Sequence, residues 1–164
     1  EEARKTAKMI GLAALKYGDL SNQAAKDYVF DMERFTSFTG NTGPYILYTI
    51  VRIKSILKNY QETAEGAEDA LILPDAGEAE RGLMLELTRY NDVMENAFAE
   101  LAPHKVCQYV YGLANAFNGF YRDNKILTEE NQGRQKGWIR LITLTRDVLS
   151  AGIHVLGFEA PERM

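Results

Sequence analysis

Tyr45, Tyr48 and Arg52 are three and four positions apart, a spacing that places side chains on one face of an α-helix. Between residues 41 and 60 the charged residues are all cations, and no acid offsets them. Aromatic rings beside cations are typical of surfaces that bind unstacked bases and their phosphates. The pattern indicates a candidate RNA-binding face. The alternative is an ordinary helix interface filled by the tyrosines, with solvated cations around it.

The element that must position these residues is a helix over 44–61. The turn Gly40–Gly43 precedes it, and Pro44 suits the first helical position, where its missing N–H costs nothing. Apolar residues recur at three- and four-residue intervals along the same stretch, which predicts a buried stripe opposite the candidate face. That stripe consists of Ile46, Ile50, Ile53 and Leu57.

The remaining periodicity favours an all-α bundle of about six helices, and no stretch has the alternation of a β-strand. Gly18 and Gly152 are expected to end the first and last long helices, because glycine adopts the left-handed conformation of a helix terminus. Three phenylalanines, Phe30, Phe35 and Phe38, are expected to pack inward. Helical patterns are expected over 1–16, 30–38, 44–61, 78–88, 93–101, 104–121 and 135–151, with an acidic connection over 62–77.

Composition limits the remaining possibilities. The chain has 164 residues, 46% of them apolar, which is enough for one core. It has no run of eighteen apolar residues, and we expect no secretory leader; its one cysteine, Cys107, fits a reducing cytoplasm as a small buried residue. Its two histidines, His104 and His154, have no ligand cluster around them, so we expect no metal site. The net charge is −4, and the acidic residues are concentrated in the stretch 61–100. Other surfaces can therefore still attract phosphates.

Three separated segments resemble arginyl-tRNA synthetases, in that family's order and close to its spacing. They are Gly40–Tyr45 with the following Tyr48 and Arg52, the stretch Asp27–Arg34, and the terminal Pro161–Met164. The resemblance implies that 1–38 is the end of a catalytic core with its connecting helices. It implies that 39–164 is an α-helical, DALR-type anticodon-binding domain of a class I aminoacyl-tRNA synthetase. The abrupt start at Glu1 agrees with a piece cut from a longer protein.

By this resemblance, the chain recognises the anticodon stem-loop of an arginine-accepting tRNA. Tyr45 and Tyr48 are expected to stack on bases and offer hydroxyl contacts, and Arg52 to hold a phosphate or a base edge. Tyr121 matches a family tyrosine and is expected to form a second platform, and the terminal Met164 to close the pocket from the other side. For single residues, simpler alternatives are an ion pair of Arg52 with the acids of 62–69, a core position for Tyr121 and a disordered end for Met164.

The resemblance also defines what the chain lacks. The ATP-binding signatures of class I synthetases, similar to His-Ile-Gly-His and Lys-Met-Ser-Lys-Ser, do not occur, so we expect no catalysis and no cofactor in this piece. ATP with Mg²⁺ and arginine would belong to the parent enzyme, whose catalytic core is an expected partner; neither a membrane nor DNA is.

Leu47 stands where many members have glutamine, Trp138–Leu141 replaces an Ala-Arg-Leu run, and the literal Asp-Ala-Leu-Arg letters are missing. These departures affect the expected base contacts. The alternative functions are a helical protein-interaction module or a non-catalytic synthetase paralogue.

Overall fold

The computed structural model describes residues 1–63, 70–73 and 76–164, without the side chains of residues 62 and 63. These ranges contain seven α-helices, one short 3-10 helix and no strand, which confirms the predicted all-α class. The predicted acidic connection over 62–77 lies largely outside the described residues. The elements are α1 (Glu2–Leu20), α2 (Met32–Thr36), α3 (Gly43–Thr63), α4 (Glu78–Thr88), α5 (Tyr90–Ala99), α6 (Pro103–Asp123), η1 (Ile126–Thr128) and α7 (Gln132–Val155).

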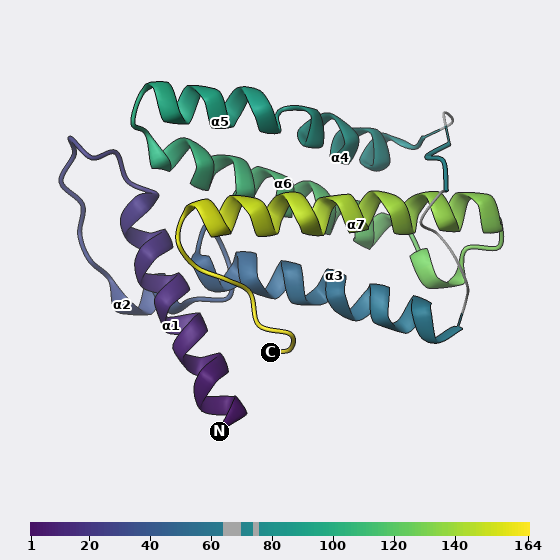
Figure 1. Cartoon of the computed structure of the whole chain (residues 1–164), viewed down its shortest axis with the longest axis horizontal. Coiled ribbons are helices and arrows are strands. Elements are labelled where there is room, and N and C mark those ends of the chain that lie inside the picture. The colour runs from purple at the N-terminus through teal and green to yellow at the C-terminus, as the bar shows by residue number, and fades with distance from the viewer. Residues whose placement is uncertain (64–69, 74–75) are drawn as a thin grey trace.

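Three long helices, α3, α6 and α7, form the centre of the bundle and pack against one another (Figure 1). Helices α4 and α5 follow one another along α6, and α1 crosses the first half of α3. The C-terminal tail leaves α7 and turns back over α3, toward α1. Two ends of the chain that are distant in sequence therefore meet beside α3.

A single apolar core joins these helices. The four residues of the predicted α3 stripe, Ile46, Ile50, Ile53 and Leu57, are all buried, as expected from their spacing. Tyr17 of α1 belongs to the same core, so α1 packs as part of the bundle. The proposed domain boundary between residues 38 and 39 stays a prediction. Helix α6 contributes the broadest buried face: Val106, Cys107, Tyr109, Val110, Leu113, Ala114, Phe117 and Phe120.

The predicted ends of two helices are wrong. Helix α1 continues past Gly18 to Leu20, and α7 continues past Gly152 to Val155. Both glycines are buried at close contacts: an added Cβ would lie 2.4 Å from the ring of Phe35 at Gly18 and 2.5 Å from Val110 at Gly152. These glycines serve packing between helices, which a single-helix pattern does not reveal.

The expected burial of all three phenylalanines near α2 is also wrong. Phe35 is 6% exposed, whereas Phe30 and Phe38 are 51% and 48% exposed. Helix α2 has only five residues and inserts one side chain, Phe35, against Gly18 of α1. The other two rings remain on the surface beside exposed Val29 and Met32.

Candidate nucleic-acid interface

Arg52 lies between two exposed tyrosines that come from different helices. Its guanidinium carbon is 4.7 Å from the centre of the Tyr48 ring on α3 and 5.7 Å from that of Tyr121 on α6. The two rings are 43% and 39% exposed. Tyr121 stacks on buried Phe117, with ring centres 6.0 Å apart. The fold thus brings together three of the predicted site residues, and the core residue Phe117 supports the ring of Tyr121.

A side chain that the sequence did not single out, Asn118, holds this arrangement. Arg52 donates from Nη1 to Oδ1 of Asn118 at 2.6 Å. The amide nitrogen of Asn118 donates to the hydroxyl oxygens of Tyr45 at 2.9 Å and Thr49 at 3.1 Å. Within the described residues no carboxylate lies at ion-pair distance from Arg52, and the alternative partners in 62–69 have no described side chains. Asn118 lies one turn before Tyr121, which is the sequence signal that could have identified it.

Tyr45 is half-buried, one turn before Tyr48 on α3. Its hydroxyl donates to Oδ1 of Asn115 at 2.7 Å and accepts the hydrogen bond from Asn118. Its ring meets Tyr111 edge to face, with centres 5.7 Å apart. Tyr45 thus joins α3 to α6, and the base stacking expected of it stays a prediction.

Met164 lies in a groove that the described structure places between α3, α7 and the tail. The groove has a volume of about 750 Å³, and Met164 is 41% exposed in it. Val51 and Ser55 of α3 line the groove with Lys54, and Arg146 of α7 borders it. The groove is lined by α3, α7 and the tail, whereas Arg52 meets Tyr121 and Asn118 of α6, so Met164 and Tyr121 approach α3 with different neighbouring helices.

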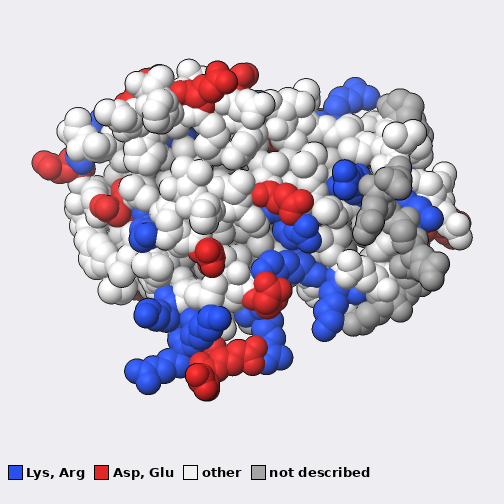
Figure 2. Space-filling model, in the orientation of Figure 1, with Lys and Arg blue, Asp and Glu red and all other residues white. Residues whose placement is uncertain are grey.

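Ion pairs and hydrogen bonds fix the tail that carries Met164. Lys54 donates to a carboxylate oxygen of Glu162 at 2.6 Å and to the carbonyl oxygens of Pro161 and Ala160 at 3.2 and 3.4 Å. Arg163 forms two hydrogen bonds with Glu2 of α1, and these lower the pKa of the Glu2 carboxyl. Figure 2 shows Lys and Arg side chains gathered where α3, α7 and the tail lie together.

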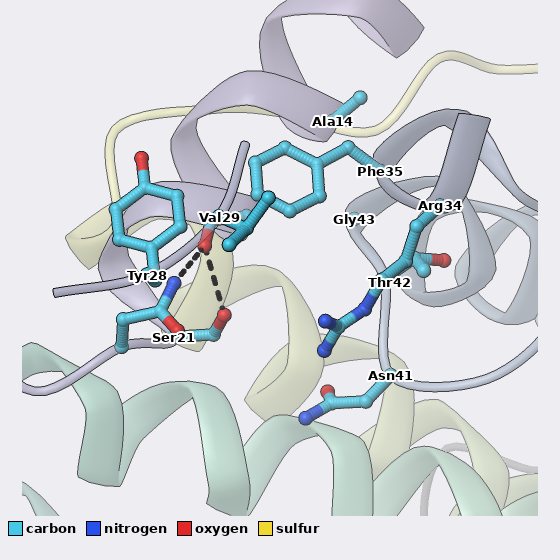
Figure 3. Close-up of a pocket in the computed structure, with 11 residues that line it drawn as sticks. Ala14, Ser21, Tyr28, Val29, Arg34, Phe35, Asn41, Thr42 and Gly43 are labelled. Atoms are coloured by element: carbon cyan, nitrogen blue, oxygen red, sulfur yellow. Dashed lines mark hydrogen bonds between the residues drawn. The ribbon is translucent and has the colours of Figure 1, made fainter. Parts of the chain in front are cut away.

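A second hollow, of about 300 Å³, lies between α1, α2 and the turn that precedes α3 (Figure 3). Phe35 covers one side of it, and the polar side chains of Ser21, Arg34 and Asn41 line the rest. Ser21 donates to the Gly18 carbonyl at 3.0 Å at the end of α1. The hollow shares none of its described lining residues with the surface formed by Tyr48, Arg52 and Tyr121.

Other chemistry finds little support in the part of the chain that the structure describes. Cys107 is fully buried as expected, and burial raises the pKa of its thiol to about 12. No group of three or more His, Cys, Asp or Glu residues in the described ranges could hold a metal ion. Among the described helices, none is sufficiently long and apolar to cross a membrane.

Fold and site together define an α-helical bundle domain that presents an arginine held against two exposed aromatic rings. The sequence profile of the DALR anticodon binding domain matches residues 46–164. The chain belongs to this family.

Proteins with similar sequences are arginine–tRNA ligases. That of Agathobacter rectalis is 59% identical and that of Alkaliphilus oremlandii 52%; each comparison covers 99% of this chain and 28% of the relative. The chain therefore spans little more than a quarter of the length of these relatives. Solved structures agree: Thermus thermophilus arginyl-tRNA synthetase superposes with a TM-score of 0.88 at 29% identity, over 98% of this chain and 27% of that one. The Plasmodium falciparum enzyme gives 0.85 at 27% identity, over 98% and 28%.

Proposed function

We propose that this chain binds the anticodon stem-loop of an arginine-accepting tRNA, as one module of an arginine–tRNA ligase. The observation that carries the proposal is the position of Arg52, held by Asn118 over the rings of Tyr48 and Tyr121. The family of the chain and the names of its relatives support the choice of ligand.

The proposed chemistry follows from the exposed groups. Loop bases that are turned out of their stack would lie on Tyr48 and Tyr121, and each stacked base contributes about 1–3 kcal/mol to binding. Arg52 would donate to a phosphate or a base edge with the N–H groups that Asn118 does not use. Met164 would contact the RNA from the groove between α3, α7 and the tail.

A second partner in this proposal is the catalytic core of the same parent protein. The relatives are more than three times as long as this chain, and α2 leaves apolar side chains exposed for a neighbour to cover. ATP with Mg²⁺ and arginine would bind to that core, and this piece would need no cofactor. A cytoplasmic location belongs to the same proposal, because tRNA is charged where translation uses it. The exposed apolar residues in and around α2 that the catalytic core would cover are Tyr28, Val29, Phe30, Met32 and Phe38.

The test is a titration of the chain with an arginine-tRNA anticodon stem-loop, beside a stem-loop whose central anticodon base is changed. We expect tighter binding of the unaltered loop, weakened about tenfold or more by Arg52→Ala and also weakened by deletion of Met164. The matched control is Arg89→Ala, which removes an exposed cation that pairs with Glu86 on α4.

Equal, weak binding of both stem-loops would contradict anticodon reading by this piece and leave only backbone contacts. Binding with no dependence on salt would contradict phosphate contacts altogether and favour a protein ligand.

A further inference from the structure

One side chain of α6, Asn118, contacts three residues of α3. It accepts from Arg52 and donates to Tyr45 and Thr49. Tyr45, Thr49 and Arg52 lie on consecutive turns of α3. The amide of Asn118 therefore contacts the same turns of α3 that carry Tyr48 and Arg52.

The direction of these hydrogen bonds is fixed by their neighbours. The Tyr45 hydroxyl gives its proton to Asn115, and the Thr49 hydroxyl gives its proton to the Tyr45 carbonyl at 3.0 Å. Both hydroxyl oxygens must therefore accept from the nitrogen of Asn118, because each hydroxyl has only one proton. The amide oxygen then faces Arg52. A reversed amide would place N–H groups against the guanidinium, which has no acceptor.

We propose that Asn118 is a positioning residue for RNA recognition, and that it acts by fixing the guanidinium of Arg52 over Tyr48 and Tyr121. This inference rests on the proposed function. Because Tyr45 and Thr49 occupy the amide nitrogen of Asn118, the amide oxygen faces Arg52 and accepts its hydrogen bond. The guanidinium is thereby fixed, with its other N–H groups directed outward. A donor held in place before binding loses less conformational entropy when the RNA arrives.

Asn118 is partly exposed, and its hydrogen bonds are part-buried, one of them to the buried hydroxyl of Thr49. Both hydroxyls keep the hydrogen bonds that they donate to Asn115 and to the Tyr45 carbonyl, so the fold should survive removal of the amide. The matched control is Asn96→Ala on α5, because Asn96 is an exposed asparagine whose amide donates only to the Asp92 carbonyl of its own helix.

The first test is a double-mutant cycle in stem-loop binding. Asn118→Ala should weaken binding about threefold to tenfold in the unaltered chain and have no further effect when Arg52→Ala is present. Asn96→Ala should leave binding unchanged in both backgrounds. Equal losses from Asn118→Ala with and without Arg52 would overturn the positioning role while leaving the proposed function standing. If the unaltered chain binds no stem-loop, the proposed function fails and the positioning role fails with it.

The second test observes Arg52 in the free protein by NMR of arginine side-chain nitrogens. A guanidinium held by Asn118 should give resolved N–H signals for Arg52, which Asn118→Ala should merge by faster rotation. Asn118→Asp should restore them, because its carboxylate still accepts from Arg52. Arg52 signals that are the same in all three proteins would overturn the inference. A merely structural role for Asn118 would not predict the recovery in Asn118→Asp.

Discussion

The ammonium of Lys54 lies 2.6 Å from the carboxylate of Glu162, at the edge of the groove that contains Met164. The Lys54 side chain is 22% exposed and that of Glu162 88%. Because the carboxylate is so exposed, this pair contributes little to the stability of the fold. The Glu162 carboxylate does occupy the Lys54 ammonium beside the proposed RNA site, so a phosphate of the RNA would compete with Glu162 for Lys54.

Replacing that acid should therefore favour RNA. We expect Glu162→Gln to tighten stem-loop binding about threefold at low salt, because it frees the Lys54 ammonium for a phosphate. The tail should stay in place, because Lys54 keeps its contacts to the Ala160 and Pro161 carbonyls. The effect should be smaller at high salt, because salt screens exposed charges. Fluorescence titration at two salt concentrations measures this. Glu95→Gln removes an exposed acid of α5 and is the control. Equal gains from both variants would mean that only net charge matters.

Gly43 of α3 lies against the backbone of Ala13 in α1. An added Cβ would lie 2.3 Å from the backbone oxygen of Ala13, which cannot move without shifting α1. Gly43→Ala should lower the free energy of unfolding by about 1–3 kcal/mol, as overpacking does. Gly82→Ala in α4 meets open space and should raise it by about 0.5–1 kcal/mol. Urea denaturation measures both, and a stable Gly43→Ala protein would show that the two helices separate easily.

Leu101, two residues after the end of α5, has a left-handed conformation, with φ of 49°, that is unfavourable for a residue with a Cβ. Its N–H donates to the Phe98 carbonyl, and the side chain is 82% exposed. Leu101→Gly should raise the free energy of unfolding by about 0.5–1 kcal/mol, because glycine adopts this conformation without strain. Leu85→Gly, at an exposed position inside α4, should lower it by about the same amount. Thermal unfolding distinguishes the two; destabilisation by both changes would show that the Leu101 side chain makes a contact that outweighs the strain.

Alkaline pH should destabilise the fold. Burial raises the pKa of Cys107 from 9.0 to about 12, and burial also raises the pKa values of Tyr17 and Tyr109. Since the unfolded chain releases these protons first, stability is complete below about pH 9 and is lost as the pH rises toward the folded pKa values. Cys107 alone should contribute a loss of up to about 1.4 kcal/mol per pH unit.

Urea denaturation between about pH 8 and pH 11 measures this slope. Cys107→Ala should reduce it, most clearly below the range where tyrosines ionise. An unchanged slope in that variant would show that the thiol has no part in it.

The local pattern of the sequence determined the helices and the face of α3 that carries the site. Helical periodicity is a property of one chain segment, so the burial of Ile46, Ile50 and Ile53 and the common face of Tyr48 and Arg52 could be predicted without neighbours. The phenylalanines near α2 were less predictable, because burial there depends on how much of a five-residue helix meets α1.

Only the tertiary structure decided which side chains meet across helices. Arg52 and Asn118 are 66 positions apart, and their hydrogen bond depends on the relative position of α3 and α6, which no spacing within either helix specifies. The same holds for Gly18 and Gly152, whose role is set by the side chains of other helices. The sequence therefore determined the groups that could bind RNA. The packing of helices decided that Tyr121 of α6 joins Arg52 while Met164 lies in the groove between α3, α7 and the tail.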